Sequence, residues 1–192
     1  MNPILDIAKR ISSDFYPLSD QGLKLLASII ETKELSKGEI YLSEGETDKY
    51  IAYVEKGLMR QFYYKNGRDI TEHFTVEGKI IFCTHSLFHQ VATQLMAEAL
   101  EPSILYRMPY KKLLELGDTY PEILHFVRKM LEFCLVLSQE KADSWRFETA
   151  RERYERFFKD FPEAAKRASV NHIASYLLMT PESLSRVRAG LL

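Results

Sequence analysis

The segment from Pro121 to Phe147 contains no glycine, and its only proline is its first residue. Proline is tolerated at the first position of a helix but not in the interior, so the segment is expected to form one helix longer than the average of a globular domain. An apolar stripe with a repeat of about 3.5 residues runs along it. Its members are Leu124, Val127, Leu131, Cys134 and Ser138.

Ile123, Met130 and Leu137 make this stripe wider than one packing partner normally requires. We therefore interpret residues 121–145 as a dimerisation helix that packs on its own domain and on a second subunit. A helix buried within one domain is the alternative interpretation. Polar residues interrupt the stripe between residues 138 and 147, where we expect a short interdomain joint.

Residues 37–108 contain short runs rich in Ile, Val, Tyr and Phe that are separated by glycines, a pattern typical of strands and turns. The clearest two runs flank Asn66 and Gly67, a pair typical of the type I′ turn of a hairpin. Because no helical crossovers are expected between the runs, the pattern favours an antiparallel β-roll of the jelly-roll kind in an α+β protein. One face of the hairpin is expected to carry Leu58, Arg60, Phe62 and Tyr64.

The N-terminal residues 3–31 carry apolar side chains at helical spacing, and Ser19 is placed to cap a second helix. Asp6, Lys9 and Arg10 stand where a secretion signal would be apolar. No apolar run reaches the roughly 18 residues that a membrane span needs. We therefore expect a cytoplasmic protein without membrane contact.

The charge distribution bears on the kind of partner, and the cysteine content bears on disulfide and zinc sites. Residues 140–192 hold 10 Lys/Arg against 8 Asp/Glu, a net of +2, and residues 1–139 hold 16 against 19, a net of −3. This asymmetry weakly favours nucleic acid as a partner of the C-terminal part. Cys83 and Cys134 are too few for a disulfide framework and match no zinc spacing, so we expect free thiols.

The C-terminal stretch SVNHIASYLLMTPESLSRVRAGLL predicts two short crossed helices. Ser169 is placed to cap the first helix, and Thr180 followed by Pro181 is a strong signal for the start of the second. The buried face of the first helix is expected to be Val170, Ile173, Ala174 and Leu177.

The second helix is expected to turn Leu184 and Val187 inward and to fit the major groove of DNA. Arg186 and Glu182 are the predicted base contacts, since arginine binds guanine and glutamate accepts from cytosine. Arg188 lies further along the helix and is expected to meet phosphate. The complete predicted DNA-binding set is Thr180, Pro181, Glu182, Ser183, Ser185, Arg186 and Arg188.

The motifs KGEIYLSEGE, YVEKGLMRQFYYKNGRDITEHF, ETARERYERFFKDFP and HIASYLLMTPESLSRVR resemble the Crp/Fnr family of transcription regulators. The resemblance implies a homodimer with a cyclic-nucleotide-binding-like β-roll over residues 1–120, the dimerisation helix, and a helix-turn-helix domain over residues 146–192. Leu178 replaces the usual turn glycine, so either an awkward backbone angle or an altered turn is expected there. The chain stops at Leu192, so no β-hairpin wing is expected.

The resemblance also bears on the effector. Family members that bind cyclic AMP use a Gly-Glu pair and an Arg-Ser or Arg-Thr pair, and here Phe82-Cys83 and Ala92-Thr93 fall at those positions. Without the arginine a cyclic phosphate loses its strongest contact, so cyclic AMP is not expected to bind in the usual manner. The predicted effector pocket comprises Phe74, Phe82, Cys83, Thr84, His85, Ala92 and Thr93.

Two other chemistries are possible for this pocket. A metal or haem site would need His73, Cys83, His85 and His89 to gather, with residues 85 and 89 on a helix. A redox sensor would need a depressed pKa at Cys83. An apolar or empty pocket is the simpler interpretation, and we predict neither a metal nor another cofactor.

The preferred function is therefore a sequence-specific DNA-binding regulator that acts as a homodimer on a palindromic operator, with RNA polymerase as a candidate further partner. A ligand-binding module of the same fold that has lost DNA binding is the alternative. An enzyme is not expected, because the sequence has no nucleophile elbow, no phosphate-cradling glycine loop and no paired metal motif.

Overall fold

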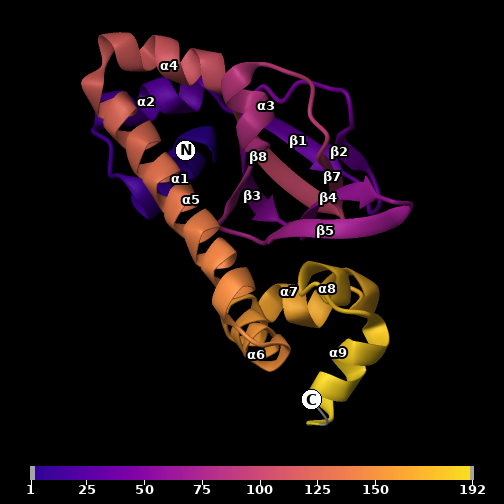
Figure 1. Ribbon diagram of the computed structural model, residues 1–192. Helices are drawn as coiled ribbons and strands as arrows, with labels where there is room; N and C mark the ends of the chain where they lie inside the picture. Colours follow the sequence, from indigo (N-terminus) through magenta and orange to yellow (C-terminus); the bar gives the residue numbers. More distant parts are fainter. Residues whose placement is uncertain (1–2, 191–192) are drawn as a thin grey trace.

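The computed structural model describes residues 3–190 and contains two four-stranded antiparallel sheets with helices on both sides (Figure 1). In spatial order the first sheet contains β1 (Glu31–Leu35), β8 (Ser103–Pro109), β3 (Tyr50–Lys56) and β6 (Ile80–Ile81). The second contains β2 (Ile40–Leu42), β7 (Met96–Ala99), β4 (Met59–Lys65) and β5 (Arg68–Thr75). The predicted antiparallel β-roll in an α+β protein is confirmed.

The two sheets enclose a core of small and branched side chains, which is consistent with a tightly closed roll. Its members include Leu35, Ala52, Val54, Met59, Ile81, Cys83, Ala97, Ala99 and Leu105. The β4–β5 hairpin turns at Asn66 and Gly67, whose φ angles of 52° and 73° are those of the predicted type I′ turn.

Helices α1 (Pro3–Phe15), α2 (Asp20–Ile29) and α4 (Tyr110–Thr119) surround the first half of the long helix α5 (Pro121–Phe147). Ser19 caps α2 as predicted, and its backbone N–H and hydroxyl also donate to the Glu122 carboxylate at 2.9 and 2.6 Å. The start of α5 is therefore tied to the start of α2. The short helix α3 (Thr84–His89) lies between β6 and β7.

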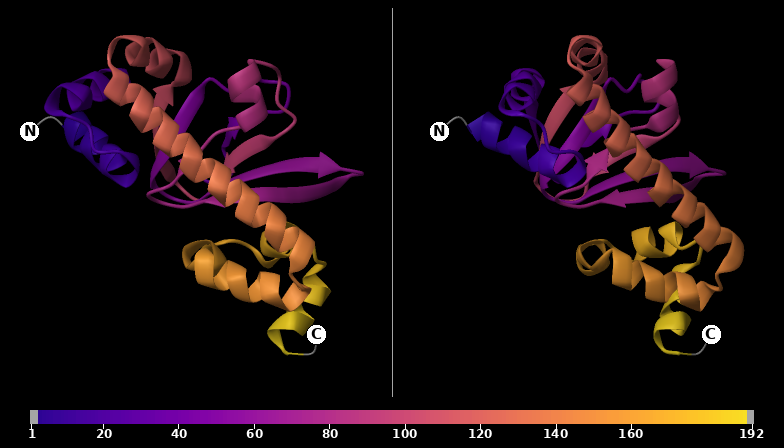
Figure 2. Two further views of the ribbon diagram at one scale, coloured as in Figure 1. Left: turned by 60° about the vertical axis from the view of Figure 1, so that its left-hand side comes forward. Right: turned by 90° about the vertical axis from the view of Figure 1, so that its left-hand side faces the viewer.

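Four short helices follow α5: α6 (Ala150–Asp160), α7 (Pro162–Arg167), α8 (Val170–Tyr176) and α9 (Pro181–Arg188). They lie beside the sheet that contains β4 and β5, next to the C-terminal end of α5 (Figure 2). The prediction of an interdomain joint within residues 138–147 is wrong, because α5 continues without interruption to Phe147. The chain instead bends at Glu148 and Thr149, where a capping box with Glu152 starts α6.

None of the helices within residues 3–190 combines the length and the apolar character that a membrane span requires.

Candidate DNA interface and sensor site

Helices α8 and α9 form a pair whose ends are capped as the sequence predicts. The Ser169 hydroxyl accepts a hydrogen bond from the backbone N–H of His172 at 3.1 Å. The Thr180 hydroxyl accepts one from the backbone N–H of Ser183 at 3.2 Å, and Pro181 occupies the first turn of α9. These bonds satisfy amide groups that a helix start leaves free, so local sequence fixes both starts.

The inward faces of the pair agree with the prediction except at one position. Leu184 and Val187 of α9 are buried, and so are the predicted core residues of α8 other than Val170. Val170 is 44% exposed, because it is the first residue of α8 and lies beyond the edge of the shared core. The remaining α8 core residues are Ile173 and Ala174, with Leu177 at the cap.

The outward face of α9 brings the predicted base and phosphate contacts together. Glu182, Ser185, Arg186 and Arg188 are exposed, whereas Ser183 is half-buried beside the cap. The pKa of Glu182 lies below its usual value because its carboxylate accepts hydrogen bonds from its own backbone N–H and from the Thr180 hydroxyl. Glu182 and Arg186 are four residues apart and share one side of the helix, whereas Arg188 is exposed on a different side.

The turn between α8 and α9 contains Leu178 at a φ of 57°, the left-handed region that glycine adopts most readily. The predicted awkward backbone angle is confirmed. The turn is nevertheless closed by backbone bonds from Leu178 N–H to Ser175 O at 3.1 Å and from Met179 N–H to Ala174 O at 2.9 Å.

Part of the predicted effector pocket is filled by side chains that bond to one another. Cys83 and Thr93 are buried inside the roll, and the Gln61 amide donates to the Cys83 Sγ at 3.2 Å and to the Phe82 carbonyl at 3.1 Å. The Thr93 hydroxyl donates to the Leu95 carbonyl at 3.1 Å and accepts from the Leu95 N–H at 2.9 Å. Gln61, Cys83 and Thr93 are thus bonded within the protein where the family resemblance implies a cyclic phosphate.

The other predicted pocket residues lie elsewhere. Thr84, His85 and Ala92 are exposed on α3 and the loop after it. The placement of Phe74 in the pocket is wrong. Because side chains alternate along β5, Phe74 points out of the roll and packs against Phe157 at a ring distance of 5.8 Å.

The histidines do not gather as a metal or haem site requires. His85 and His89 face each other on α3 with ring centroids 4.9 Å apart, whereas His73 lies on β5 against the ring of Phe161 at 6.2 Å. Within residues 3–190, no group of three or more potential metal ligands occurs. Burial raises the pKa of the Cys83 thiol to about 11, which is opposite to the shift that a thiolate sensor needs.

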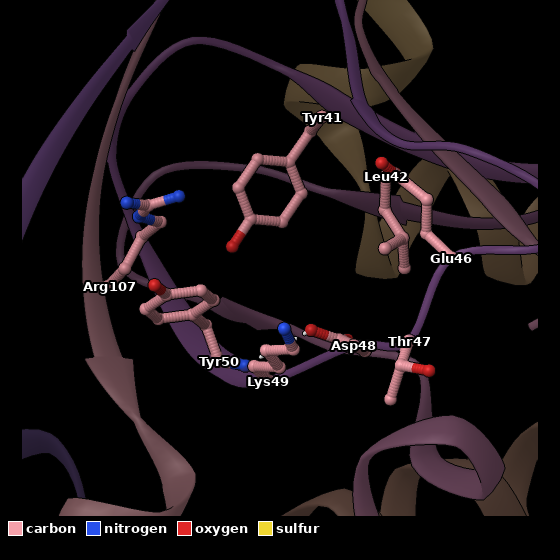
Figure 3. Close-up of a pocket in the computed structure, with 8 residues that line it drawn as sticks. All are labelled: Tyr41, Leu42, Glu46, Thr47, Asp48, Lys49, Tyr50 and Arg107. Atoms are coloured by element: carbon pink, nitrogen blue, oxygen red, sulfur yellow. Dashed lines mark hydrogen bonds between the residues drawn. The ribbon is translucent and has the colours of Figure 1, made fainter. Parts of the chain in front are cut away.

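A surface hollow of about 370 Å³ lies next to the start of β3 (Figure 3). The Arg107 guanidinium stacks 4.2 Å from the centre of the Tyr50 ring and bonds to Glu31 at 2.9 Å. At its base the buried Asp48 carboxylate accepts from the Cys83 N–H at 2.7 Å. The sequence does not predict this hollow, because separate strands and loops contribute its lining: Tyr41, Leu42, Glu46, Thr47, Asp48, Lys49, Tyr50 and Arg107.

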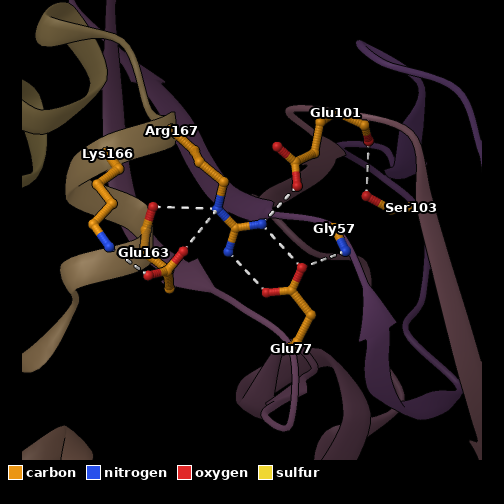
Figure 4. A network of polar contacts seen from close by, with 7 residues as sticks. All are labelled: Gly57, Glu77, Glu101, Ser103, Glu163, Lys166 and Arg167. Atoms are coloured by element: carbon orange, nitrogen blue, oxygen red, sulfur yellow. Dashed lines mark hydrogen bonds and ion pairs between the residues drawn. The ribbon is translucent and has the colours of Figure 1, made fainter.

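A polar contact between the C-terminal helices and the roll is likewise not predicted by the sequence. Arg167 of α7 binds Glu77 through two nitrogens at 2.8 and 2.9 Å and binds Glu101 at 2.7 Å (Figure 4). On the α5 side, Lys141 bonds to the Glu72 carboxylate at 2.7 Å. The signal available in the sequence was the high density of charged residues around the hairpin, but the pairing depends on tertiary structure.

The predicted stripe on α5 divides between two environments. Val127 is 4% exposed in the core of its own subunit, so it belongs to the part of the stripe that packs on its own domain. Leu124 and Leu135 are 43% and 71% exposed, with Ser138 exposed further along the same side. Leu131 and Cys134 are half-buried between these two environments.

Comparisons with known proteins agree with this architecture. The family model for the cyclic nucleotide-binding domain matches residues 32–120. Electron transport regulator A of Shewanella oneidensis is 24% identical over 185 residues, which cover 90% of this chain and 73% of that protein.

Two solved structures are similar in fold. FixK2 from Bradyrhizobium japonicum has a TM-score of 0.72 at 20% identity, covering 85% of this chain and 84% of FixK2. The c-di-GMP responsive global regulator CLP of Xanthomonas campestris has a TM-score of 0.70 at 15% identity, covering 90% of this chain and 91% of CLP. These likenesses therefore include residues outside the range that the family model matches.

Proposed function

We propose that the protein is a dimeric transcription regulator that binds double-stranded DNA through α9. The match of residues 32–120 to the cyclic nucleotide-binding domain model and the similarity in fold to Crp/Fnr regulators support this proposal. The observation that carries the proposal is the two-sided character of α9. Its apolar side is buried, its free side offers Glu182 and Arg186 to a partner, and Arg188 is exposed beside the buried side. An exposed helix with these groups suits the major groove.

The dimer is proposed to form along α5. Leu124 and Leu135 leave apolar surface exposed on one side of this helix, and a second α5 would cover it. Twofold symmetry would then present two α9 helices to a palindromic operator, with half-sites about 34 Å apart. RNA polymerase is a candidate further partner of the bound dimer.

We propose that the effector is not cyclic AMP bound in the usual manner, and no cofactor is invoked. Gln61, Cys83 and Thr93 occupy the expected phosphate position and supply no cationic group there. CLP, a protein of the same fold, is responsive to c-di-GMP, which supports the view that this fold accommodates effectors other than cyclic AMP. Regulation rather than catalysis is the proposed role of the whole chain.

The test is duplex selection from a random-sequence library with the full chain, followed by binding titrations. Arg186→Ala should weaken binding about tenfold or more and relax the preference at one base pair. Arg188→Ala should weaken all duplexes alike and reduce the salt slope by about 1. Lys111→Ala, which removes a 91% exposed charge from α4, is the matched control and should change neither quantity.

Absence of any selected duplex at low salt would contradict the proposal and support the alternative, a ligand-binding module of the same fold that has lost DNA binding.

A further inference from the structure

Strand β4 carries two consecutive buried polar side chains that face opposite sides of the sheet. Arg60 is 2% exposed and Gln61 is 7% exposed. Successive side chains of a strand point to opposite faces, and here both faces are covered. Gln61 points into the roll, where its amide donates to the Phe82 carbonyl and the Cys83 thiol.

Arg60 points to the outer face, where it is held by carboxylates from both neighbouring strands. Its Nη1 and Nη2 donate to Asp69 of β5 at 2.6 and 2.8 Å, and its Nε donates to Glu98 of β7 at 2.7 Å. Nη1 also donates to the Thr71 hydroxyl at 3.1 Å. A buried guanidinium with this many charge-assisted bonds has one well-defined position, and any movement of the strand must move its partners.

The same part of β5 holds helix α8. The Ser175 hydroxyl accepts a hydrogen bond from the Thr71 N–H at 2.6 Å and donates to the Asp69 carbonyl at 3.2 Å. Thus Asp69 and Thr71 bind Arg60 through their side chains and Ser175 through their backbone. Because α8 packs directly on α9, the position of this segment sets the position of the proposed DNA-reading helix.

We infer that Arg60 is a positioning residue that couples the interior of the β-roll to the orientation of the α8–α9 pair. An effector that displaces Gln61 from Cys83 would shift β4, and Arg60 would pass the shift to the Asp69–Thr71 segment and so to Ser175. The inference rests on the proposed function for its consequence on DNA, but the mechanical coupling is testable without DNA. In this inference β4 and β5 transmit a change inside the roll to the C-terminal helices.

The single tryptophan offers a readout of this coupling. Lys141 lies 4.4 Å from the ring of Trp145 and 5.4 Å from the ring of Tyr176 in α8, and it bonds to Glu72 of β5. If α8 packs less tightly, the Trp145 ring should therefore become more accessible to solvent. Acrylamide quenching of the full chain measures this change directly.

Two variants separate local damage from coupling. Ser175→Ala removes the contact on the α8 side and should increase the quenching constant of Trp145. Gln61→Met acts inside the roll, without a contact to the C-terminal helices, and should increase it in the same direction. Ser28→Ala, an exposed serine of α2 that bonds only within its own helix, is the control and should leave quenching unchanged. Circular dichroism verifies that each variant is folded.

DNA provides the second readout. The ratio of affinities for a selected palindrome and for the same palindrome lengthened by half a helical turn should fall about fivefold in both variants, the effect expected for one lost hydrogen bond. Combining Gln61→Met with Ser175→Ala should give less than the product of the two single effects.

The inference is overturned if Gln61→Met leaves Trp145 quenching at the wild-type value while Ser175→Ala changes it, since β4 would then not transmit the change. A wild type that binds no duplex would contradict the proposed function instead, and the quenching comparison would still decide the coupling.

Discussion

Phe74 on β5 and Tyr176 on α8 lie with ring centroids 5.5 Å apart, across the boundary between the roll and the C-terminal helices. The Phe157 ring of α6 contacts both, at 5.8 and 5.2 Å. The two parts of the chain therefore share one aromatic core, to which Leu58 of the β-roll also belongs. The C-terminal helices are fixed on the roll by packing as well as by ion pairs.

Removal of the Phe157 ring should destabilise the whole chain. Phe157 is 2% exposed, and Phe157→Ala is expected to lower the free energy of unfolding by about 3–5 kcal/mol because it leaves a cavity in the shared core. Phe147→Ala, at a side chain that is 80% exposed, should change the same quantity by less than about 0.5 kcal/mol. Urea denaturation measures both, and equal effects would contradict a shared aromatic core.

Acid should weaken the same interface through His73. Desolvation, with a smaller effect of Lys141, lowers the pKa of His73 to about 4 from an ordinary value of 6.5. The unfolded chain then binds this proton more readily, so stability is complete above pH 6.5 and is lost as the pH falls toward 4. The expected loss between pH 7.5 and pH 5 is about 2 kcal/mol.

His73→Gln should flatten this part of the pH profile, measured as urea midpoints at a series of pH values. The control is His125→Gln, at an exposed histidine that contacts the Pro121 carbonyl of its own helix. A profile of His73→Gln that matches the wild type would show that another group causes the dependence.

The turn at Leu178 should tolerate glycine. Leu178 has a φ of 57° and a side chain that is 55% exposed, so Leu178→Gly removes backbone strain and little buried surface. We expect the free energy of unfolding to rise by up to about 1 kcal/mol. Leu177→Gly, at the adjacent residue that is 2% exposed, should lower it by more than about 2 kcal/mol, and thermal melting compares the two. A lower midpoint for Leu178→Gly would contradict the strain.

Local signals explain what the sequence predicted correctly. The Asn66–Gly67 turn and the caps Ser19, Ser169 and Thr180 each depend on residues within a few positions of one another. The buried face of α9 follows from helical periodicity in the same way. Such features require no knowledge of which elements become neighbours.

The errors concern tertiary neighbours. Alternation places Phe74 on one face of β5 but does not tell which face the C-terminal helices cover. The polar residues at the end of α5 are typical of a joint, whereas in the structure Lys141 bonds to Glu72 and Ser144 to Glu148. The partners of Arg60 lie 9 and 38 residues away in sequence, so only strand pairing reveals them.

Dimerisation through α5 should depend on Leu135. This side chain is 71% exposed in the single chain, and neighbouring Val136 is 56% exposed, so both lack apolar cover on a helix whose other side is buried. Leu135→Asp would place a charge in the proposed interface and is expected to weaken the dimer about 100-fold or more, the effect of losing a central apolar contact.

Sedimentation equilibrium measures the dissociation constant of the dimer. Leu114→Asp on α4 is the matched control, because Leu114 is 37% exposed outside the stripe. Binding to a palindrome should fall with the dimer, whereas binding to a single half-site should not. A wild type that sediments as a monomer at micromolar concentration, or a Leu135→Asp variant with an unchanged constant, would place the interface elsewhere.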